Sequence, residues 1–211
     1  MSLTFYYAPM STASVTEAVL AELGVPCERV RLDIGAGTRR PDFLRLNPNG
    51  RVPTIVHDGT PIWESAAITL YLGETFGVAA GLYPAPGPKR GEAMKWVVWA
   101  NVALAEAGGR LAASLPAGSE GGVQAGSQDV STPDAGAAER AKEDIAACLR
   151  ILEGALESSP FLLGTYSLAD THMHAFAGWL GMMGVELGPY PNVAQWMARC
   201  GARPALSQAA A

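Results

Sequence analysis

Short apolar and aromatic runs alternate with helical stretches in the first part of the chain. The expected elements are, in order, a strand at about Leu3 to Tyr7, a helix at about Thr12 to Leu23, a strand at about Glu28 to Leu32 and a short helix around Pro41 to Leu46. Gly24 and Pro26 follow the first helix in the order that is typical of a helix end. This succession predicts an α/β unit in which the first two strands are parallel.

A β-hairpin and a further helix complete this unit. Residues 54–57 and 60–63 have the pattern of two short strands, and Asp58-Gly59 between them is a strong signal for a two-residue hairpin turn. A helix is then expected from about Ser65 to Phe76. The predicted order is therefore β-α-β-α-β-β-α.

Residues on either side of the hairpin suggest a ligand site. Val52 can offer its backbone N–H and C=O groups as an extended edge, and Pro53 would fix the turn that exposes them. The bond between them is a candidate for the cis form. Glu64 and Ser65 stand at a helix start, where free N–H groups and the helix dipole favour a carboxylate. A peptide-like edge beside an anion site suits a small acidic peptide such as glutathione.

The composition changes at residues 83–88, Tyr-Pro-Ala-Pro-Gly-Pro, which predict a stiff linker. Helices are expected after it at about residues 89–113, 137–156, 167–183 and 192–200. The Gly-, Ser- and Ala-rich residues 116–136 form a long loop, which we expect to be mobile and to lie near the mouth of a cleft. The predicted organisation is an α/β domain at 1–83, a linker at 84–88 and an all-helical domain at 89–211.

Composition and charge exclude several classes of protein. With 49% hydrophobic and only 17% charged residues, the chain can bury a substantial core. Its net charge of −5 and the lack of a basic cluster predict no nucleic-acid binding. No apolar run is long enough for a membrane span, and no secretory signal precedes the first strand. Three widely separated cysteines without a Cys-x-x-Cys motif disfavour a disulfide framework and favour the cytoplasm.

Four motifs occur in a characteristic order along the chain. They are Phe5-Tyr6-Tyr7-Ala8-Pro9, Asn47-Pro48-Asn49-Gly50-Arg51-Val52-Pro53, Glu64-Ser65-Ala66-Ala67-Ile68 and Ser167-Leu168-Ala169-Asp170. Their order and spacing resemble the cytosolic glutathione transferase superfamily over essentially the whole chain. The resemblance implies a thioredoxin-like domain that binds glutathione, followed by an all-helical domain that supplies most of the pocket for an apolar co-substrate. It also implies that the last motif is a structural helix capping box.

The resemblance directs attention to the start of the first helix. Glutathione attacks as a thiolate, and a free thiol titrates near pH ~8.5. The family lowers that pKa with a hydroxyl or backbone N–H in this turn. Counted from Pro9, Ser11 falls where serine-type members place their hydroxyl; counted back from Gly24, Thr12 aligns with the cysteine of the bacterial beta class. Both residues could also cap the helix with the same amides. Tyr7 is a third candidate, by analogy with tyrosine-type classes.

Two departures from known family patterns narrow the class of glutathione transferase that the chain resembles. The beta-class cysteine is absent, so mixed-disulfide chemistry of the beta type is not expected, and Gly108 stands where that class has a histidine. The Ser-Ser-Cys cluster of zeta-type isomerases does not match residues 11–14. The resemblance therefore indicates a bacterial protein of serine/threonine type.

By the same resemblance, Val52 and Pro53 would present the edge that pairs with the cysteinyl backbone of glutathione. Glu64 and Ser65 would hold the γ-glutamyl amine and carboxylate. Arg51 could pair with the glycyl carboxylate. The alternatives are that Arg51 is a solvated surface charge and that Glu64 is an ordinary helix-start carboxylate.

Other polar and aromatic residues carry weaker signals. Asn101 could reach the site of a neighbouring subunit. His172 and His174 diverge by roughly 200° on a helix, so they predict structural roles and no metal site. Cys27 is expected to be buried. The residues expected in the core, in a subunit contact or along the co-substrate pocket are Trp96, Trp99, Trp179, Met182 and Met183.

We therefore expect a homodimeric cytoplasmic glutathione transferase, active in detoxification, that directs the glutathione thiolate at a small hydrophobic electrophile. Its partners would be these two molecules, without nucleic acid, membrane or metal. One alternative is glutathione-dependent isomerisation, dehalogenation or ether cleavage. Another is a binding protein that kept the fold and lost the activity.

Overall fold

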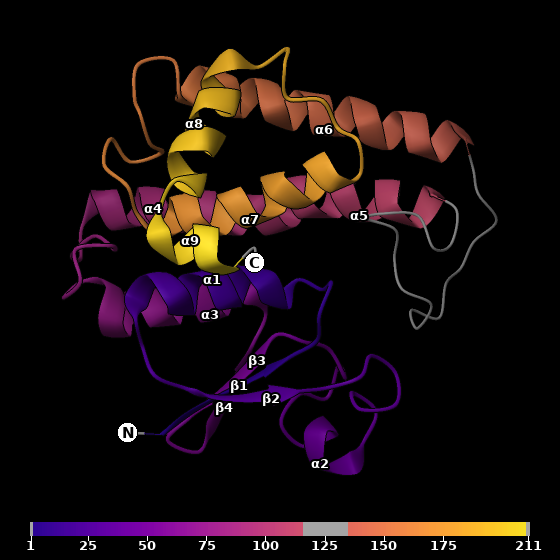
Figure 1. Ribbon diagram of the computed structural model, residues 1–211, viewed down its shortest axis with the longest axis vertical. Coiled ribbons are helices and arrows are strands. Elements are labelled where there is room, and N and C mark those ends of the chain that lie inside the picture. The colour runs from indigo at the N-terminus through magenta and orange to yellow at the C-terminus, as the bar shows by residue number, and fades with distance from the viewer. Residues whose placement is uncertain (1, 116–134, 210–211) are drawn as a thin grey trace.

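The computed structural model of the protein describes residues 2–115 and 135–209 (Figure 1). A small sheet with its helices forms one part, and a bundle of helices covers it on one side. The expected α/β and all-helical parts are confirmed. The expected loop at 116–136 lies outside the described residues except for its last two, which belong to a helix.

The sheet has four strands in the order β2-β1-β3-β4. They are β1 (Leu3–Tyr7), β2 (Glu28–Arg31), β3 (Thr54–His57) and β4 (Thr60–Trp63). β1 and β2 are parallel, whereas β3 is antiparallel to both β1 and β4. The predicted strands, the hairpin and the parallel crossover are therefore confirmed.

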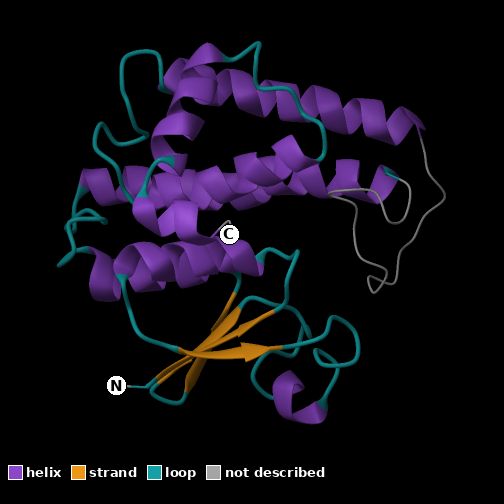
Figure 2. Ribbon diagram, viewed as in Figure 1, coloured by secondary structure: helices purple, strands orange, loops and turns teal. Residues whose placement is uncertain are grey.

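Two helices of the first part, α1 (Ala13–Leu23) and α3 (Ser65–Leu72), lie against one face of the sheet (Figure 2). The short helix α2 (Pro41–Leu44) stands apart from them. The helix expected to reach Phe76 changes at its end into a π-helix, η1 (Gly73–Gly77). A side chain at Gly73 or Gly77 would come within 2.8 Å of buried Tyr83, so both glycines lie directly against that residue.

The second part is helical. Its elements are α4 (Pro88–Trp99), the π-helix η2 (Ala100–Ala105), α5 (Glu106–Ser114), α6 (Ala135–Ala155), α7 (Leu168–Met182), α8 (Pro191–Gly201) and α9 (Pro204–Ala209). The single helix expected at about 89–113 is thus interrupted by a wider turn at η2. No helix of the described residues is long and apolar enough to cross a membrane.

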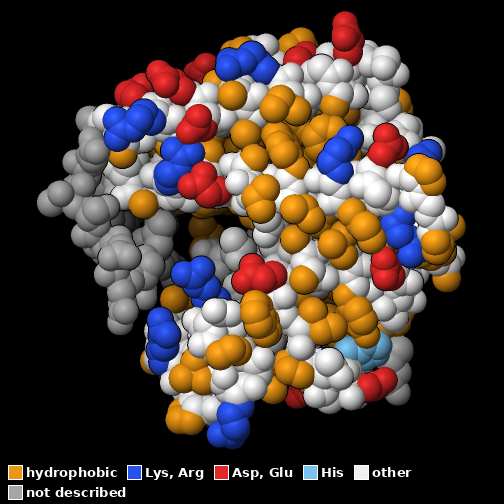
Figure 3. Space-filling view, turned by 180° about the vertical axis from the view of Figure 1, so that it is seen from behind, with side chains coloured by type: hydrophobic (Ala, Val, Ile, Leu, Met, Phe, Trp, Pro, Cys, Tyr) orange, Lys and Arg blue, Asp and Glu red, His pale blue; other side chains and the backbone are white. Residues whose placement is uncertain are grey.

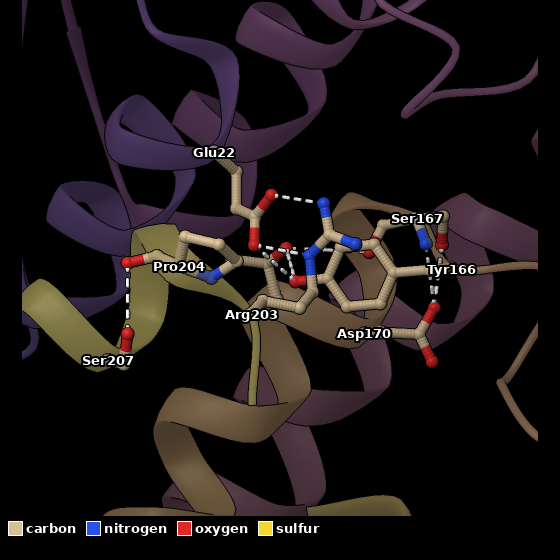
Figure 4. Close-up of polar contacts among 8 residues, drawn as sticks. Glu22, Tyr166, Ser167, Asp170, Arg203, Pro204 and Ser207 are labelled. Atoms are coloured by element: carbon tan, nitrogen blue, oxygen red, sulfur yellow. Dashed lines mark hydrogen bonds and ion pairs between the residues drawn. The ribbon is translucent and has the colours of Figure 1, made fainter. Parts of the chain in front are cut away.

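The core runs through both parts, because α1 packs against α7 and α9. Figure 4 shows the polar contact at this boundary, where Arg203 donates two hydrogen bonds of 2.6 and 2.7 Å to the carboxylate of Glu22. The Tyr166 hydroxyl donates to the same carboxylate at 2.9 Å, and the Arg203 guanidinium lies 3.7 Å from the centre of the Tyr166 ring. The Glu22 side chain is only 2% exposed, so this contact neutralises a charge that burial would otherwise make costly.

The predicted capping box at the start of α7 is confirmed. The buried carboxylate of Asp170 accepts hydrogen bonds from the Ser167 N–H and hydroxyl, each at 3.0 Å. It also accepts from the Leu162 N–H at 2.9 Å and from the Trp196 indole at 3.0 Å. Burial raises the pKa of Asp170, and these four donors oppose that change. Asp170 therefore ties α8 and the preceding loop to α7, as a structural residue.

Candidate functional site

The strand register gathers the predicted site at one edge of the sheet. Thr54, the first residue of β3, pairs with Trp63 at the end of β4 and with Tyr6 near the end of β1. Residues that precede β3, follow β4 or follow β1 therefore lie at the same edge. Those segments carry Val52 and Pro53, Glu64 and Ser65, and the turn before α1.

The loop before β3 is held by the side chain of Asn47. This asparagine is buried, and its amide nitrogen donates to the Arg51 carbonyl at 2.8 Å and to the Thr54 hydroxyl at 3.1 Å. Its amide oxygen accepts from the Asn49 N–H at 3.0 Å. The Val52–Pro53 peptide bond is cis, as predicted. The backbone edge at Val52 is thus presented by a turn with fixed hydrogen bonds.

The two hydroxyls before α1 have different partners. Ser11 donates to the Ala8 carbonyl at 2.7 Å and accepts from the Ala13 N–H at 3.2 Å, so it closes the turn. Thr12 is exposed, and its hydroxyl donates to the Val52 carbonyl at 3.2 Å. This contact joins the start of α1 to the backbone edge. Of the two hydroxyls, that of Thr12 therefore contacts the Val52 backbone, whereas that of Ser11 bonds within its own turn.

The start of α3 combines strain with burial. Glu64 has a φ of 72°, in a region that residues other than glycine seldom adopt, and it immediately precedes the helix. Such strain clusters at ligand sites. Ser65 is 4% exposed, and its hydroxyl accepts a hydrogen bond of 2.9 Å from the Asn101 amide. Glu64 and Ser65 therefore stand at the start of α3, as expected, and the Asn101 amide holds the Ser65 hydroxyl.

A chain of polar side chains continues from Ser65 into the helical part. The other amide atom of Asn101 lies 2.8 Å from Nε2 of His172, whose Nδ1 lies 2.8 Å from the Thr69 hydroxyl. His172 and Thr69 are fully buried, and burial lowers the pKa of His172 to about 3. Asn101 was expected to reach a neighbouring subunit. Its amide bonds to Ser65 and His172 of its own chain, and the contact with a neighbouring subunit stays a prediction.

The side chains of the two other candidates, Tyr7 and Arg51, have different surroundings. The Tyr7 ring stacks on Phe5, and the Arg29 guanidinium lies 4.9 Å from its centre. Because Arg29 belongs to β2, the Tyr7 ring is packed against side chains of β1 and β2. The side chain of Arg51 is exposed beside the loop, where it can meet a ligand in solution.

The cysteines do not supply an activated thiol. Burial raises the pKa of the Cys27, Cys148 and Cys200 thiols. Cys27 is only partly buried, less than expected. Among the described residues, no three His, Cys, Asp or Glu side chains are grouped so that they could hold a metal. Any thiol chemistry at this edge would therefore depend on a thiol brought by the ligand.

Sequence reasoning missed Asn47, Thr69 and the site connection of His172. Asn47 was visible only as part of a turn motif, and Thr69 and His172 are 103 positions apart. Gly108 has a clear reason to be glycine, because a side chain there would come within 2.8 Å of the Trp179 ring. Any side chain at that position would therefore require the Trp179 and Leu180 side chains to shift.

Two family models match the chain. The model "Glutathione S-transferase, N-terminal domain" matches residues 1–74, and "Glutathione S-transferase, C-terminal domain" matches residues 111–204. Among similar proteins, the disulfide-bond oxidoreductase YfcG of Escherichia coli strain K12 is 29% identical over 213 residues, which span 97% of this chain and 92% of YfcG.

Solved structures resemble the whole chain. A glutathione transferase from Methylococcus capsulatus strain Bath has a TM-score of 0.82 and 26% identity, covering 98% of this chain and 96% of that one. A glutathione transferase homologue from Sulfitobacter, solved with bound glutathione, has a TM-score of 0.77 and 25% identity, with the same coverage of 98% and 96%. The likeness therefore includes both the sheet part and the helical part.

Proposed function

The chain belongs to the glutathione S-transferase family, and from this premise we propose that it binds glutathione at the sheet edge. The Val52 backbone, exposed by cis-Pro53, pairs with the cysteinyl residue of the tripeptide. Glu64 receives the γ-glutamyl amine, and Ser65 with the start of α3 receives the γ-glutamyl carboxylate. Arg51 pairs with the glycyl carboxylate at the other end. The Sulfitobacter homologue with bound glutathione supports this ligand.

One observation carries the catalytic part of the proposal: the Thr12 hydroxyl lies 3.2 Å from the Val52 carbonyl. A cysteinyl residue paired with Val52 would place its sulfur close to this hydroxyl. We propose that Thr12 turns to donate to the sulfur and stabilises the thiolate. Ser11 then serves chiefly to close the turn at the helix start, since its hydroxyl donates to Ala8 and accepts from Ala13 within that turn.

The electrophile is proposed to be small and hydrophobic. Met10, next to the thiolate turn, is 67% exposed and offers an apolar surface to such a molecule. The space-filling view shows a hollow between the helical part and the sheet part on one side of the molecule (Figure 3). The thiolate would attack the electrophilic carbon, form the C–S bond and expel a leaving group or generate a carbanion that takes up a proton.

We also propose a cytoplasmic homodimer with a domain at 1–83, a linker at 84–88 and a helical domain at 89–211. The large apolar side chains exposed on the described surface include Trp63 at 37%, Val98 at 44% and Val102 at 65%, and a partner subunit would cover these three. Light scattering coupled to size exclusion should give twice the chain mass of 22.0 kDa. The chain mass itself would contradict the dimer.

A second activity has one observation in its favour, the similarity to a disulfide-bond oxidoreductase over 97% of the chain. In this reaction a glutathione thiolate attacks a disulfide, and a second glutathione releases the remaining thiol, giving two thiols and oxidised glutathione. The raised pKa values of the three cysteine thiols suit a reaction in which glutathione supplies every reacting thiol.

The activities are separated by assaying the purified chain with glutathione and either an activated aryl halide or a small dialkyl disulfide. Formation of the aryl thioether supports transfer, whereas oxidised glutathione formed with the disulfide supports reduction. Calorimetric binding of glutathione without turnover of either substrate would indicate a binding protein. Absence of glutathione binding would contradict the proposal altogether.

A further inference from the structure

Hydrogen bonds join Thr69, His172, Asn101 and Ser65 in a chain, and in each bond the donor lies on the Thr69 side. The amide nitrogen of Asn101 faces Ser65, so Asn101 donates to the Ser65 hydroxyl and accepts from His172. The proton of the imidazole is therefore on Nε2, and Nδ1 accepts from the Thr69 hydroxyl. A neutral imidazole has one N–H donor and one acceptor nitrogen, so His172 donates to Asn101 and accepts from Thr69.

This direction decides what Ser65 can offer to a ligand. Because the Ser65 oxygen already accepts from Asn101, its own proton is free to point toward the ligand. If the chain ran the other way, Ser65 would donate to Asn101 and present only lone pairs to a carboxylate. A hydroxyl that donates to an anion stabilises it, whereas one that presents lone pairs repels it.

We propose that Asn101 and His172 are positioning residues that hold the Ser65 hydroxyl in the orientation that donates to the γ-glutamyl carboxylate. The inference rests on the proposed glutathione site and adds residues of the helical part to it. His172 comes from α7 and Asn101 from η2, whereas Thr69 and Ser65 come from α3. The site on the sheet part is therefore completed by the helical part.

Three features support a role beyond filling space. All three bonds are 2.8 or 2.9 Å long, well within hydrogen-bond distance, so the chain is continuous from Thr69 to Ser65. Full burial keeps His172 neutral, as the one-way chain requires. Asn101 lies at the start of a π-helix, a feature that is frequent at functional sites because it displaces side chains from the regular helix path.

The test compares two ligands by titration calorimetry on the full chain. One is glutathione, and the other is 4-aminobutyryl-cysteinyl-glycine, which lacks only the carboxylate that Ser65 would hold. Asn101→Asp replaces the amide nitrogen that faces Ser65 with a second acceptor oxygen. The Ser65 hydroxyl must then donate to this side chain and not to the ligand. The substitution should weaken glutathione binding by at least about 10-fold and leave binding of the analogue within about 2-fold.

His172→Phe tests the second residue without adding a charge. It removes the donor that holds the Asn101 amide, so glutathione binding should weaken by about 3- to 10-fold, again without change for the analogue. His172→Gln keeps a donor close to the position of Nε2 and should restore affinity to within about 2-fold. The matched control is His174→Phe on the same helix, whose ring lies against Trp196, and it should bind both ligands as the unaltered chain does.

The outcomes distinguish this inference from the function on which it rests. If the unaltered chain binds no glutathione, both fall. If the unaltered chain prefers glutathione to the analogue, but Asn101→Asp weakens both ligands equally or neither, the positioning role alone is overturned. Circular dichroism verifies folding, and if His172→Phe does not fold, Asn101→Asp with His172→Gln decides the question.

Discussion

At the scale of single residues, two adjacent hydroxyls illustrate how position separates a cap from a thiolate donor. Ser11 and Thr12 lie in the same turn, yet Ser11 bonds within the turn while Thr12 reaches across to Val52. The sequence placed both at the helix start. It could not separate them, because Val52 is 40 positions away and the distinguishing contact forms only in the fold.

Removing the two hydroxyls should therefore have different effects. Thr12→Val preserves shape and should lower kcat/KM for conjugation by about 10²-fold or more, because it removes a donor to a developing thiolate. Ser11→Ala should cost about 1 kcal/mol in the free energy of unfolding and affect kcat/KM less. Steady-state kinetics and urea unfolding of both variants check this. Equal kinetic losses, or a loss confined to Ser11→Ala, would contradict the assignment.

The buried His172 should make the free energy of unfolding depend on pH. An unfolded histidine titrates near pH ~6.5, whereas burial lowers the pKa of folded His172 to about 3. The unfolded chain therefore binds more protons between these values, so the free energy of unfolding falls as pH decreases below ~6.5.

The contribution from His172 should approach ~1.4 kcal/mol per pH unit. His172→Gln should reduce the slope by up to that amount between pH ~6 and ~4, as measured by urea unfolding at each pH. His174, whose pKa is also lowered by burial, contributes in the same direction to both proteins. Identical slopes in the two proteins would show that His172 is not held neutral.

At the scale of elements, the loop before β3 depends on one glycine. Gly50 has a φ of 61°, and a Cβ there would lie 2.9 Å from the Thr38 carbonyl. Gly24, which ends α1, also has a φ of 61° but has open space around its Cβ position. The two glycines therefore share a left-handed backbone conformation, and of the two only Gly50 has close neighbours at its Cβ position.

This pair gives a matched test. Gly24→Ala should cost roughly 1–2 kcal/mol in the free energy of unfolding, which is the cost of the left-handed conformation. Gly50→Ala should cost more and should also weaken glutathione binding, since the loop that presents Val52 must shift. Urea unfolding and calorimetry measure both effects. Equal destabilisation without a change in glutathione affinity would show that the close approach at Gly50 is unimportant.

Local pattern predicted some elements better than others. The hairpin at β3 and β4 was located because its Asp58-Gly59 turn is encoded locally. The π-helices were missed because they depend on distant packing, such as Tyr83 against Gly73. The helices expected from the sequence end at about residue 200, so they do not include α9. It is six residues long, too short for a periodic pattern to define it.

At the scale of the whole molecule, the sheet part and the helical part are joined by polar contacts, two of which centre on buried side chains. One is the chain from Ser65 to His172, and the other is the contact of Glu22 with Arg203 and Tyr166 (Figure 4). The family resemblance predicted both parts. Neither contact was visible in the sequence, because each joins residues far apart in the chain.

Arg203→Met should destabilise the molecule by about 2 kcal/mol, because it leaves the buried Glu22 carboxylate with the Tyr166 hydroxyl and without its charged partner. The loss should be smaller than for a fully buried pair, since 34% of the Arg203 side chain is exposed. Thermal and urea unfolding measure it. Because this contact joins α1 to the segment before α9, away from the sheet edge, glutathione affinity should not change. Unchanged stability would contradict the role of the contact.

The central claim is that this chain binds glutathione at the sheet edge and that Thr12 stabilises its thiolate. The most direct measurement is the pH titration of the ultraviolet thiolate absorbance of glutathione bound to the unaltered chain and to Thr12→Val. The account predicts a thiol pKa below ~8.5 with the unaltered chain and a return toward ~8.5 with the variant. The same pKa in both proteins, or no glutathione-dependent thiolate signal at all, would contradict it.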